Sequence, residues 1–223
     1  MKKVYCFTGL GADKRVLESL QLPDYDLIYI DWIPPLTGES ISEYAQRLLP
    51  QISTQNPILM GLSFGGMMMM EVAKLIPTEK LISLASAKTK HEIPFYYRIF
   101  RWLPIYKWLP TKWLIHPNLI TYWLFGAKSK EEKELLKAIL HDTDGLFFLW
   151  AVEQILLWEN ATVPTNIFHI HGTSDHILPA YFAQTDVLIQ GGGHFMTVNC
   201  AKEICLNIIE YLNQPQNSLQ ENE

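Results

Sequence analysis

The chain alternates short apolar runs with stretches that have helical spacing, and no other feature constrains its fold as strongly. Strands that are buried on both faces are apolar along their whole length, because neither face meets water. Strands that alternate with helices form parallel sheets. The six runs of this kind are KVYCFTG, YDLIYIDW, NPILMGLS, KLISLAS, TNIFHIHG and TDVLIQGG. The alternation therefore predicts an α/β fold built on a mainly parallel sheet of about six strands.

Helical patterns follow most of these runs. SISEYAQRLLPQI predicts a helix that begins at Ser40, whose side chain and that of Glu43 form a capping box. FGGMMMMEVAKLI predicts a second helix, in which we interpret Met67–Met70 as packing residues. NCAKEICLNIIEYL predicts a closing helix. Between the last two runs, HILPAYFAQ is short for a parallel crossover, so a helix there is expected to have at most about two turns.

Residues 88–160 interrupt the alternation. Their first half is rich in aromatic residues and proline, and their second half predicts two helices separated by a turn at Asp144-Gly145. We interpret Asp142 and Asp144 as capping and turn residues. The length of 223 residues suits one large domain or two small ones. We predict a single domain with a core of residues 1–87 and 161–214, a helical insertion of about residues 88–160 and a polar, frayed tail of residues 215–223.

The segment Gly61-Leu62-Ser63-Phe64-Gly65 has the pattern G-x-S-x-G and lies where the third apolar run meets its helix. In that setting the pattern is typical of a nucleophile elbow, a tight turn that exposes the serine hydroxyl. The two glycines are needed because side chains at these positions would collide with neighbouring backbone. Gly66 would let the following helix approach the sheet closely. Ser63 is therefore the predicted nucleophile.

A serine hydroxyl is a weak nucleophile at neutral pH and needs a base. His194 lies in GGGHF, directly after the last run, where a loop can carry an imidazole to the carboxyl edge of the sheet. Asp175 follows the fifth run in GTSD, whereas no acid before Glu92 follows the fourth run. The chain order Ser63, Asp175, His194 is that of α/β-type hydrolases. Two further histidines, interpreted as core or supporting residues of the fifth run, are His169 and His171.

Acyl transfer also requires backbone N–H donors for the oxyanion. We predict the N–H groups of Phe64, next to the nucleophile, and of Leu10, in the loop FTGLGAD after the first run. The same loop lacks a dinucleotide fingerprint, since Lys14 stands where its third glycine would be. No histidine and cysteine spacing matches a zinc site. No cofactor and no metal are therefore predicted.

On these motifs the chain resembles the α/β-hydrolase superfamily: FTGLGAD as the oxyanion loop, GLSFGG as the elbow, GTSDHILP as the acid loop and GGGHF as the histidine loop. The resemblance spans almost the whole chain. It implies a serine hydrolase that cleaves a carboxylic ester or thioester through a Ser-His-Asp triad and an acyl-enzyme. It also implies that residues 88–160 form a helical cap over the active site.

The chain departs from the superfamily in three ways, one of which is the short crossover HILPAYFAQ. The usual N-terminal antiparallel hairpin is missing, so the sheet should be wholly parallel, and Thr8-Gly9 replaces the usual His-Gly of the oxyanion loop. Two alternatives remain open, because superfamily members share these motifs across several activities. The triad could serve a lyase or acyltransferase, or the chain could be a binding module without catalysis.

Composition sets the expected location and excludes some partners. The net charge of −5 argues against nucleic-acid binding. No apolar run reaches the length of a membrane helix, and the first residues do not resemble a secretory signal. An odd number of cysteines without a CxxC motif favours a reduced, cytoplasmic protein. These cysteines, interpreted as buried thiols, are Cys6, Cys200 and Cys205. No oligomeric state is predicted.

Within the insertion, residues 88–113 form a basic aromatic segment, KTKHEIPFYYRIFRWLPIYKWLPTKW, with a single acid at Glu92. Its cations are Lys88, Lys90, Arg98, Arg101, Lys107 and Lys112. Three interpretations remain open. The aromatic residues could form the core of the insertion below a solvated basic face. They could instead line an acyl pocket with a cationic mouth for a substrate such as a coenzyme A thioester. Finally, the segment could adsorb to an anionic membrane surface.

Overall fold

A single sheet of six parallel strands forms the centre of the protein. The computed structural model describes residues 1–104, 106, 108, 110–111 and 115–215. The strand order is β2-β1-β3-β4-β5-β6, and each neighbouring pair is parallel. The bounds are Lys2–Phe7 for β1, Tyr25–Tyr29 for β2, Ile58–Leu62 for β3, Lys80–Leu84 for β4, Ile167–Gly172 for β5 and Val187–Ile189 for β6. The predicted parallel sheet is confirmed.

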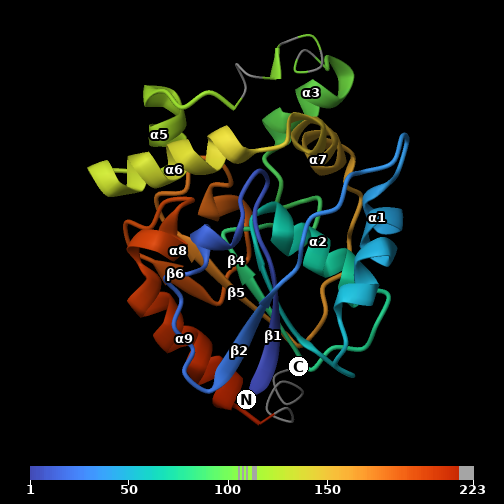
Figure 1. Cartoon of the computed structure of the whole chain (residues 1–223), viewed down its shortest axis with the longest axis vertical. Helices are drawn as coiled ribbons and strands as arrows, with labels where there is room; N and C mark the ends of the chain where they lie inside the picture. Colours follow the sequence, from blue (N-terminus) through green and yellow to red (C-terminus); the bar gives the residue numbers. More distant parts are fainter. Residues whose placement is uncertain (105, 107, 109, 112–114, 216–223) are drawn as a thin grey trace.

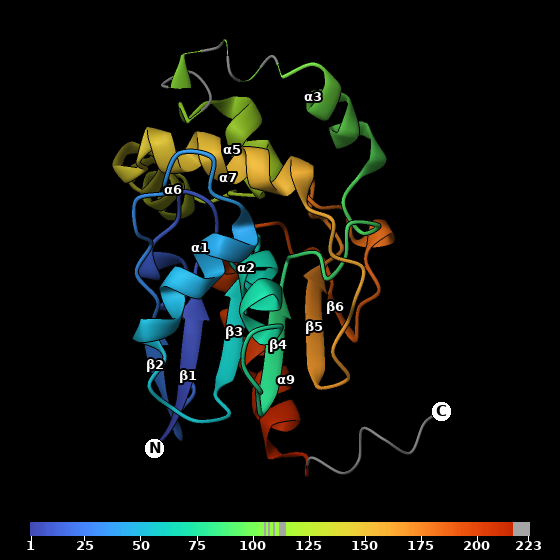
Figure 2. The same cartoon turned by 90° about the vertical axis from the view of Figure 1, so that its right-hand side faces the viewer.

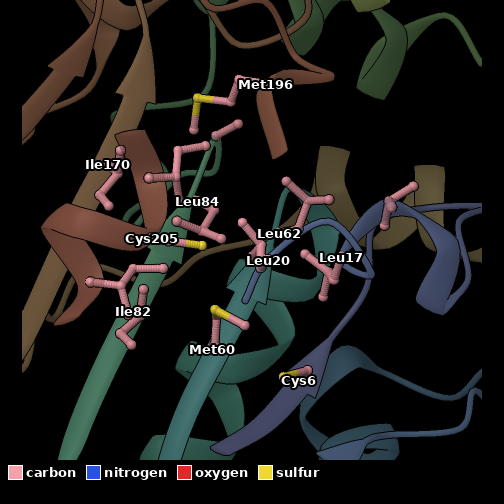
Figure 3. Packing of buried hydrophobic residues seen from close by; sticks show 14 of the residues in the cluster. Cys6, Leu17, Leu20, Met60, Leu62, Ile82, Leu84, Ile170, Met196 and Cys205 are labelled. Carbon is pink, nitrogen blue, oxygen red and sulfur yellow. The ribbon is translucent and has the colours of Figure 1, made fainter. Parts of the chain in front are cut away.

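Helices cover both faces of the sheet, as Figure 2 shows, with α1 (Ile41–Leu48) and α2 (Phe64–Ala73) on one face and α9 (Ala201–Asn213) on the other. Successive residues of a strand point to opposite faces. In β1, Val4 and Cys6 accordingly join the core on the α9 side, and Tyr5 and Phe7 join the core on the α2 side. Figure 3 shows the α9-side core, where Met60 of β3 and Ile82 of β4 lie near Cys205 of α9. Both faces are apolar because both are buried.

The strand order changes direction at the neighbouring strands β1 and β3, because β2 is added on one side of β1 and β3 on the other. From β1 it passes through a short 3-10 helix (Lys14–Val16), whose Val16 packs on the α9 side, to the edge strand β2. From β3 it passes into α2 on the opposite face. The loops after these neighbouring strands therefore diverge, and such a point at the carboxyl edge is where α/β sheets bind ligands.

Local sequence signals agree with the ends of several elements. The Ser40 Oγ accepts a hydrogen bond from the Glu43 N–H at 3.3 Å, and the Glu43 carboxylate accepts one from the Ser40 N–H at 2.9 Å, which confirms the capping box of α1. At the end of α9, the buried Lys80 ammonium donates to the carbonyls of Tyr211, Leu212 and Gln214, where the negative end of the helix dipole favours a cation. The crossover between β5 and β6 holds one 3-10 turn, Ala180–Phe182, as short as predicted.

The insertion of residues 88–160 lies beyond the carboxyl ends of the strands (Figures 1 and 2). Its described residues contain helices and no strand. The Asp144 carboxylate caps α7 by accepting from the Phe147 N–H at 2.7 Å, as predicted. Asp142 is the last residue of α6, and its carboxylate pairs with Arg15 at 2.7 Å. The helices are α3 (Arg98–Trp102), α5 (Leu119–Phe125), α6 (Lys130–Asp142) and α7 (Gly145–Leu157).

Some predicted features lie outside the described residues, namely Lys107, Lys112 and the tail after Pro215. Among the helices that are described, none is both long and apolar enough to cross a bilayer.

Candidate active site

Ser63 occupies the junction at which β3 passes directly into α2. Its backbone has φ 53° and ψ −122°, a conformation that is costly for a residue with a side chain. A Cβ placed on Gly61 would lie 2.5 Å from the Gly65 carbonyl oxygen, and one on Gly65 would lie 2.2 Å from that of Phe7. The predicted steric role of the two glycines is therefore confirmed. The Ser86 hydroxyl, which donates to the Ser63 carbonyl at 2.6 Å, holds the turn from the neighbouring strand.

The structure brings the three predicted side chains of the site together. His194, in the loop between β6 and α8 (Met196–Asn199), places its Nε2 atom 2.8 Å from the Ser63 Oγ. Its Nδ1 atom lies 2.7 Å from the Asp175 Oδ2. Because a carboxylate only accepts, Nδ1 carries the proton, and Nε2 is free to accept the serine proton. Ser63 is half-buried and thus accessible, whereas Asp175 and His194 are buried.

The Asp175 carboxylate is surrounded by donors. Its Oδ1 accepts the backbone N–H groups of Ile177 and Leu178, each at 2.9 Å. Its Oδ2 faces His171 Nε2 at 3.4 Å in addition to His194. Burial by itself would raise the pKa of Asp175, but the two histidines outweigh it and lower this pKa below its ordinary value. The acid is therefore ionised at neutral pH and can stabilise a protonated His194.

Two histidines of β5 support the acid from behind. His169 and His171 are fully buried, as expected for core residues. His171 Nε2 lies 2.6 Å from the Leu178 carbonyl, to which it donates, and its Nδ1 lies 3.1 Å from His169 Nε2. Burial lowers the pKa of His169 to about 3. The spacing of His171 and Asp175, four residues apart around a strand end, was a signal for this contact that sequence reasoning did not use.

The loop after β1 runs alongside the serine. A Cβ on Gly9 would lie 3.5 Å from the Ser63 Cβ. The Thr8 hydroxyl accepts from the Trp32 indole N–H at 2.8 Å and donates to the Ala12 carbonyl at 2.7 Å, so it bridges the loop and the end of β2. Within the described part of the chain, the N–H groups predicted to hold an oxyanion, those of Leu10 and Phe64, donate to no other protein group.

An aromatic cluster joins the elbow to the insertion. Phe64 packs edge-on against Phe147 and Trp150 of α7, with ring centroids 6.2 and 6.0 Å apart. Trp32 contacts Phe147 at 5.2 Å, and Trp150 contacts Tyr44 of α1 at 4.4 Å. Sequence reasoning missed Trp32 and Trp150. The position of Trp32, at the end of the second apolar run, could have placed it at the same edge of the sheet as Ser63.

The insertion also contacts the histidine loop. The Phe195 N–H donates to the Phe125 carbonyl at 2.9 Å, and the Phe125 ring packs edge-on against the His194 imidazole at 5.7 Å. A Cβ on Gly193 would lie 3.0 Å from the Gly126 Cα. The end of α5 therefore rests on the loop that carries His194.

A cavity of about 470 Å³ lies beside Asp175, between the insertion and the acid loop. Trp123 of α5 stacks on His176 with ring centroids 4.1 Å apart and forms one wall. Its lining residues are Tyr96, Trp123, Thr173, Asp175, His176, Pro179, Ala180 and Tyr181. No cluster of three or more histidine, cysteine or acidic side chains suited to a metal ion occurs among the described residues.

Comparison with known proteins identifies the fold. No family model and no curated protein sequence matches the chain. Its structure is similar to a bromoperoxidase from Bacillus anthracis, with a TM-score of 0.71, 17% identity and coverage of 96% of this chain and 92% of the other. It is also similar to an esterase from Exiguobacterium antarcticum, with a TM-score of 0.69, 16% identity and coverage of 96% of this chain and 92% of the other. A thermophilic esterase from Thermogutta terrifontis also matches, with a TM-score of 0.72, 16% identity and coverage of 95% of this chain and 89% of the other. The chain therefore has the fold of the α/β-hydrolase superfamily.

Proposed function

We propose that the protein is a serine hydrolase that cleaves a carboxylic ester or thioester through an acyl-enzyme. One observation carries this proposal, the continuous hydrogen-bond chain from Ser63 Oγ through His194 to the Asp175 carboxylate. The strained backbone of Ser63, at the junction of a strand and a helix, supports it. Two of the structurally similar proteins, which share only 16% of their residues with this chain, are named as esterases.

In the first half of the reaction, the Ser63 Oγ attacks the carbonyl carbon while its proton passes to His194 Nε2. Asp175 holds the Nδ1 proton and stabilises the imidazolium. The N–H groups of Leu10 and Phe64 would donate to the oxyanion that forms on the carbonyl oxygen. The intermediate collapses when the bond to the alkoxide or thiolate breaks, and the His194 proton passes to that leaving group.

In the second half, water attacks the acyl-enzyme and gives its proton to His194 Nε2. The bond to Ser63 Oγ then breaks, and the proton returns to the serine. The products are the carboxylic acid and the alcohol or thiol, and the free enzyme is restored. Burial of His194 and Asp175 strengthens these electrostatic contacts, because the surroundings of the site have a lower dielectric constant than water.

The insertion of residues 88–160 is proposed to be a cap on a single hydrolase domain with a core of residues 1–87 and 161–214. Its helices lie beyond the strand ends. Phe125 packs against His194, and Phe147 packs against Phe64, the residue after Ser63. The cavity beside Asp175, with Trp123 and Tyr96 from the insertion, would hold part of the substrate. The three cysteines are free, which is in keeping with the proposed cytoplasmic location.

The proposal is tested with acyl-chain series of p-nitrophenyl esters and acyl-coenzyme A thioesters on the wild type and on Ser63→Ala. We expect Ser63→Ala to lose roughly 10³-fold or more of kcat/KM. A fluorophosphonate probe should label the wild type and not the variant. Unchanged ester turnover in Ser63→Ala would exclude the mechanism.

The same samples separate the two alternatives. An acyl-enzyme that transfers its acyl group to an acceptor other than water would favour an acyltransferase. A folded wild type that resists labelling would favour a binding module.

A further inference from the structure

Large apolar side chains lie exposed on two short helices, and between them at Trp108, at one end of the molecule. Figures 1 and 2 place α3 and α5 at the end of the long axis opposite the amino terminus. Trp102 is 82% exposed, Trp108 is 78% exposed and Leu119 is 84% exposed. We use the name distal apolar face for the exposed residues Ile99, Trp102, Leu103, Trp108, Leu119 and Ile120.

The spacing of these residues shows that whole helix faces are exposed. Ile99, Trp102 and Leu103 are spaced i, i+3 and i+4 along α3 and its C-terminal cap, so they share one face. On α5, Leu119 and Ile120 share a face in the same way with Trp123. A helix is stabilised in a folded protein mainly by burial of its apolar face. Exposed apolar helix faces of this kind mark interaction sites, whereas single exposed apolar residues need no explanation.

The charge of the surrounding segment limits the partner. Six of the 18 Lys and Arg residues fall between positions 88 and 112, but only one of the 23 acids does, which leaves 12 cations and 22 acids in the rest of the chain. That acid, Glu92, is buried beside Lys88, which is also buried, with Lys88 Nζ 3.9 Å from Glu92 Oε1, so these two charges offset each other. Near α3, Lys90 and Arg101 share the single carboxylate of Glu159, each at 2.7 Å, so their charges are only partly neutralised. Four of the six residues of the distal apolar face, all but Leu119 and Ile120, thus belong to a basic segment of an acidic protein.

We propose that the distal apolar face binds the surface of an anionic phospholipid bilayer. Tryptophan is favoured at the interface between lipid and water, and nearby cations attract acidic headgroups. A second copy of the chain fits less well, because pairing the two faces would bring two basic segments together. Apolar side chains at the end of the molecule can enter a fluid surface without a matching groove, as interfacial helices do. In this orientation the insertion, rather than the sheet, meets the membrane.

The test measures co-sedimentation of the purified full chain with vesicles of phosphatidylcholine alone or of equal parts phosphatidylcholine and phosphatidylglycerol. We expect binding to the mixed vesicles only, weakened by salt. Trp102→Ser combined with Leu119→Ser should weaken this binding by about tenfold or more. The matched control is Leu36→Ser combined with Leu206→Ser, since these leucines are exposed outside the distal apolar face. Circular dichroism checks that both double variants are folded.

Several outcomes overturn the proposal. Two of them are equal binding of the wild type to both vesicle types and equal binding by the two double variants. The third is a wild type that binds no lipid and forms a dimer in light scattering, where Trp102→Ser combined with Leu119→Ser makes the dimer dissociate. The last result would assign the face to a second copy. Ser63→Ala should bind the vesicles as the wild type does, so the lipid proposal and the hydrolase proposal fail independently.

Discussion

Helices α2 and α3 are both rich in apolar residues, but they meet opposite surroundings. From Phe64 to Val72, every residue of α2 is buried between the sheet, α1 and α7. In α3, Ile99 and Trp102 point into solvent. The comparison teaches that the core builds its site from contacts within the chain, whereas the outer insertion carries apolar surface that no described part of the chain covers. Changes in the core should therefore affect stability and catalysis, and changes on the distal apolar face should affect neither.

The largest effect is expected at the acid. Asp175→Asn keeps the shape of the side chain but removes the charge that stabilises protonated His194 and its Nδ1–H tautomer. We expect kcat to fall by about 10⁴-fold with little change in KM. The measurement is steady-state ester hydrolysis, with Asp144→Asn on the surface as the matched control. A loss of less than about tenfold would remove Asp175 from the proposed role.

The next effect concerns the stability of the elbow. Gly65→Ala would place a methyl group 2.2 Å from the carbonyl oxygens of Phe7 and Thr8, which belong to backbone that cannot move aside. We expect a loss of about 3 kcal/mol or more in the free energy of unfolding, measured in urea. At Gly38 a Cβ would meet no atom within 4 Å, although φ is +75°, so Gly38→Ala should lose about 1 kcal/mol. Equal losses would contradict the steric explanation.

A smaller effect is the pH dependence of stability at His169. Burial, together with the neighbouring His171 and Lys88, lowers the pKa of His169 to about 3, while the carbonyl of Gln184 opposes the shift. The unfolded chain then binds a proton below its pKa of about 6.5 that the folded protein does not bind. The contribution of His169 to the free energy of unfolding is therefore at its maximum above about pH 6.5 and falls as the pH decreases toward 3.

Between pH 6.5 and pH 5, this proton should reduce the free energy of unfolding by about 2 kcal/mol. Urea unfolding at pH 6.5 and pH 5 measures this decrease in the wild type and in His169→Gln. The variant should lack the part of the decrease that is due to His169. His91→Gln, at an exposed position, is the control and should keep the wild-type dependence. Parallel pH curves for the wild type and His169→Gln would assign the effect to other groups.

The smallest effect is expected on the distal apolar face. It allows a comparison of two tryptophans of the insertion, the exposed Trp102 and the packed Trp150. Trp102→Ser should change the free energy of unfolding by no more than about 0.5 kcal/mol, because the indole is exposed. Trp150→Ser should lose about 3 kcal/mol, because that indole packs on Phe64 and Tyr44 and donates to the Glu39 carbonyl. A large loss in Trp102→Ser would mean that α3 depends on contacts within the chain.

Much of the core could be predicted from the sequence, because the signals are local. A buried parallel strand is apolar along its length, and a serine between closely spaced glycines needs a tight turn. The alternation predicted the six strands, and the motifs identified Ser63, Asp175 and His194, which the structure brings into one hydrogen-bond chain. Their convergence follows from topology, since the carboxyl ends of parallel strands meet at one edge of the sheet.

The rest depends on contacts between residues that are distant in the chain. Sequence spacing did not connect Trp32 to Thr8, or Phe147 and Trp150 to Phe64, because each contact requires the packed positions of two separate elements. Periodicity placed apolar residues along the helices of the insertion, but it carries no information on whether another element covers them. The sequence by itself therefore determined the sheet and the three groups that are proposed to react. Only the tertiary structure decided what supports those groups and which apolar face stays exposed, because burial is a property of the packed chain.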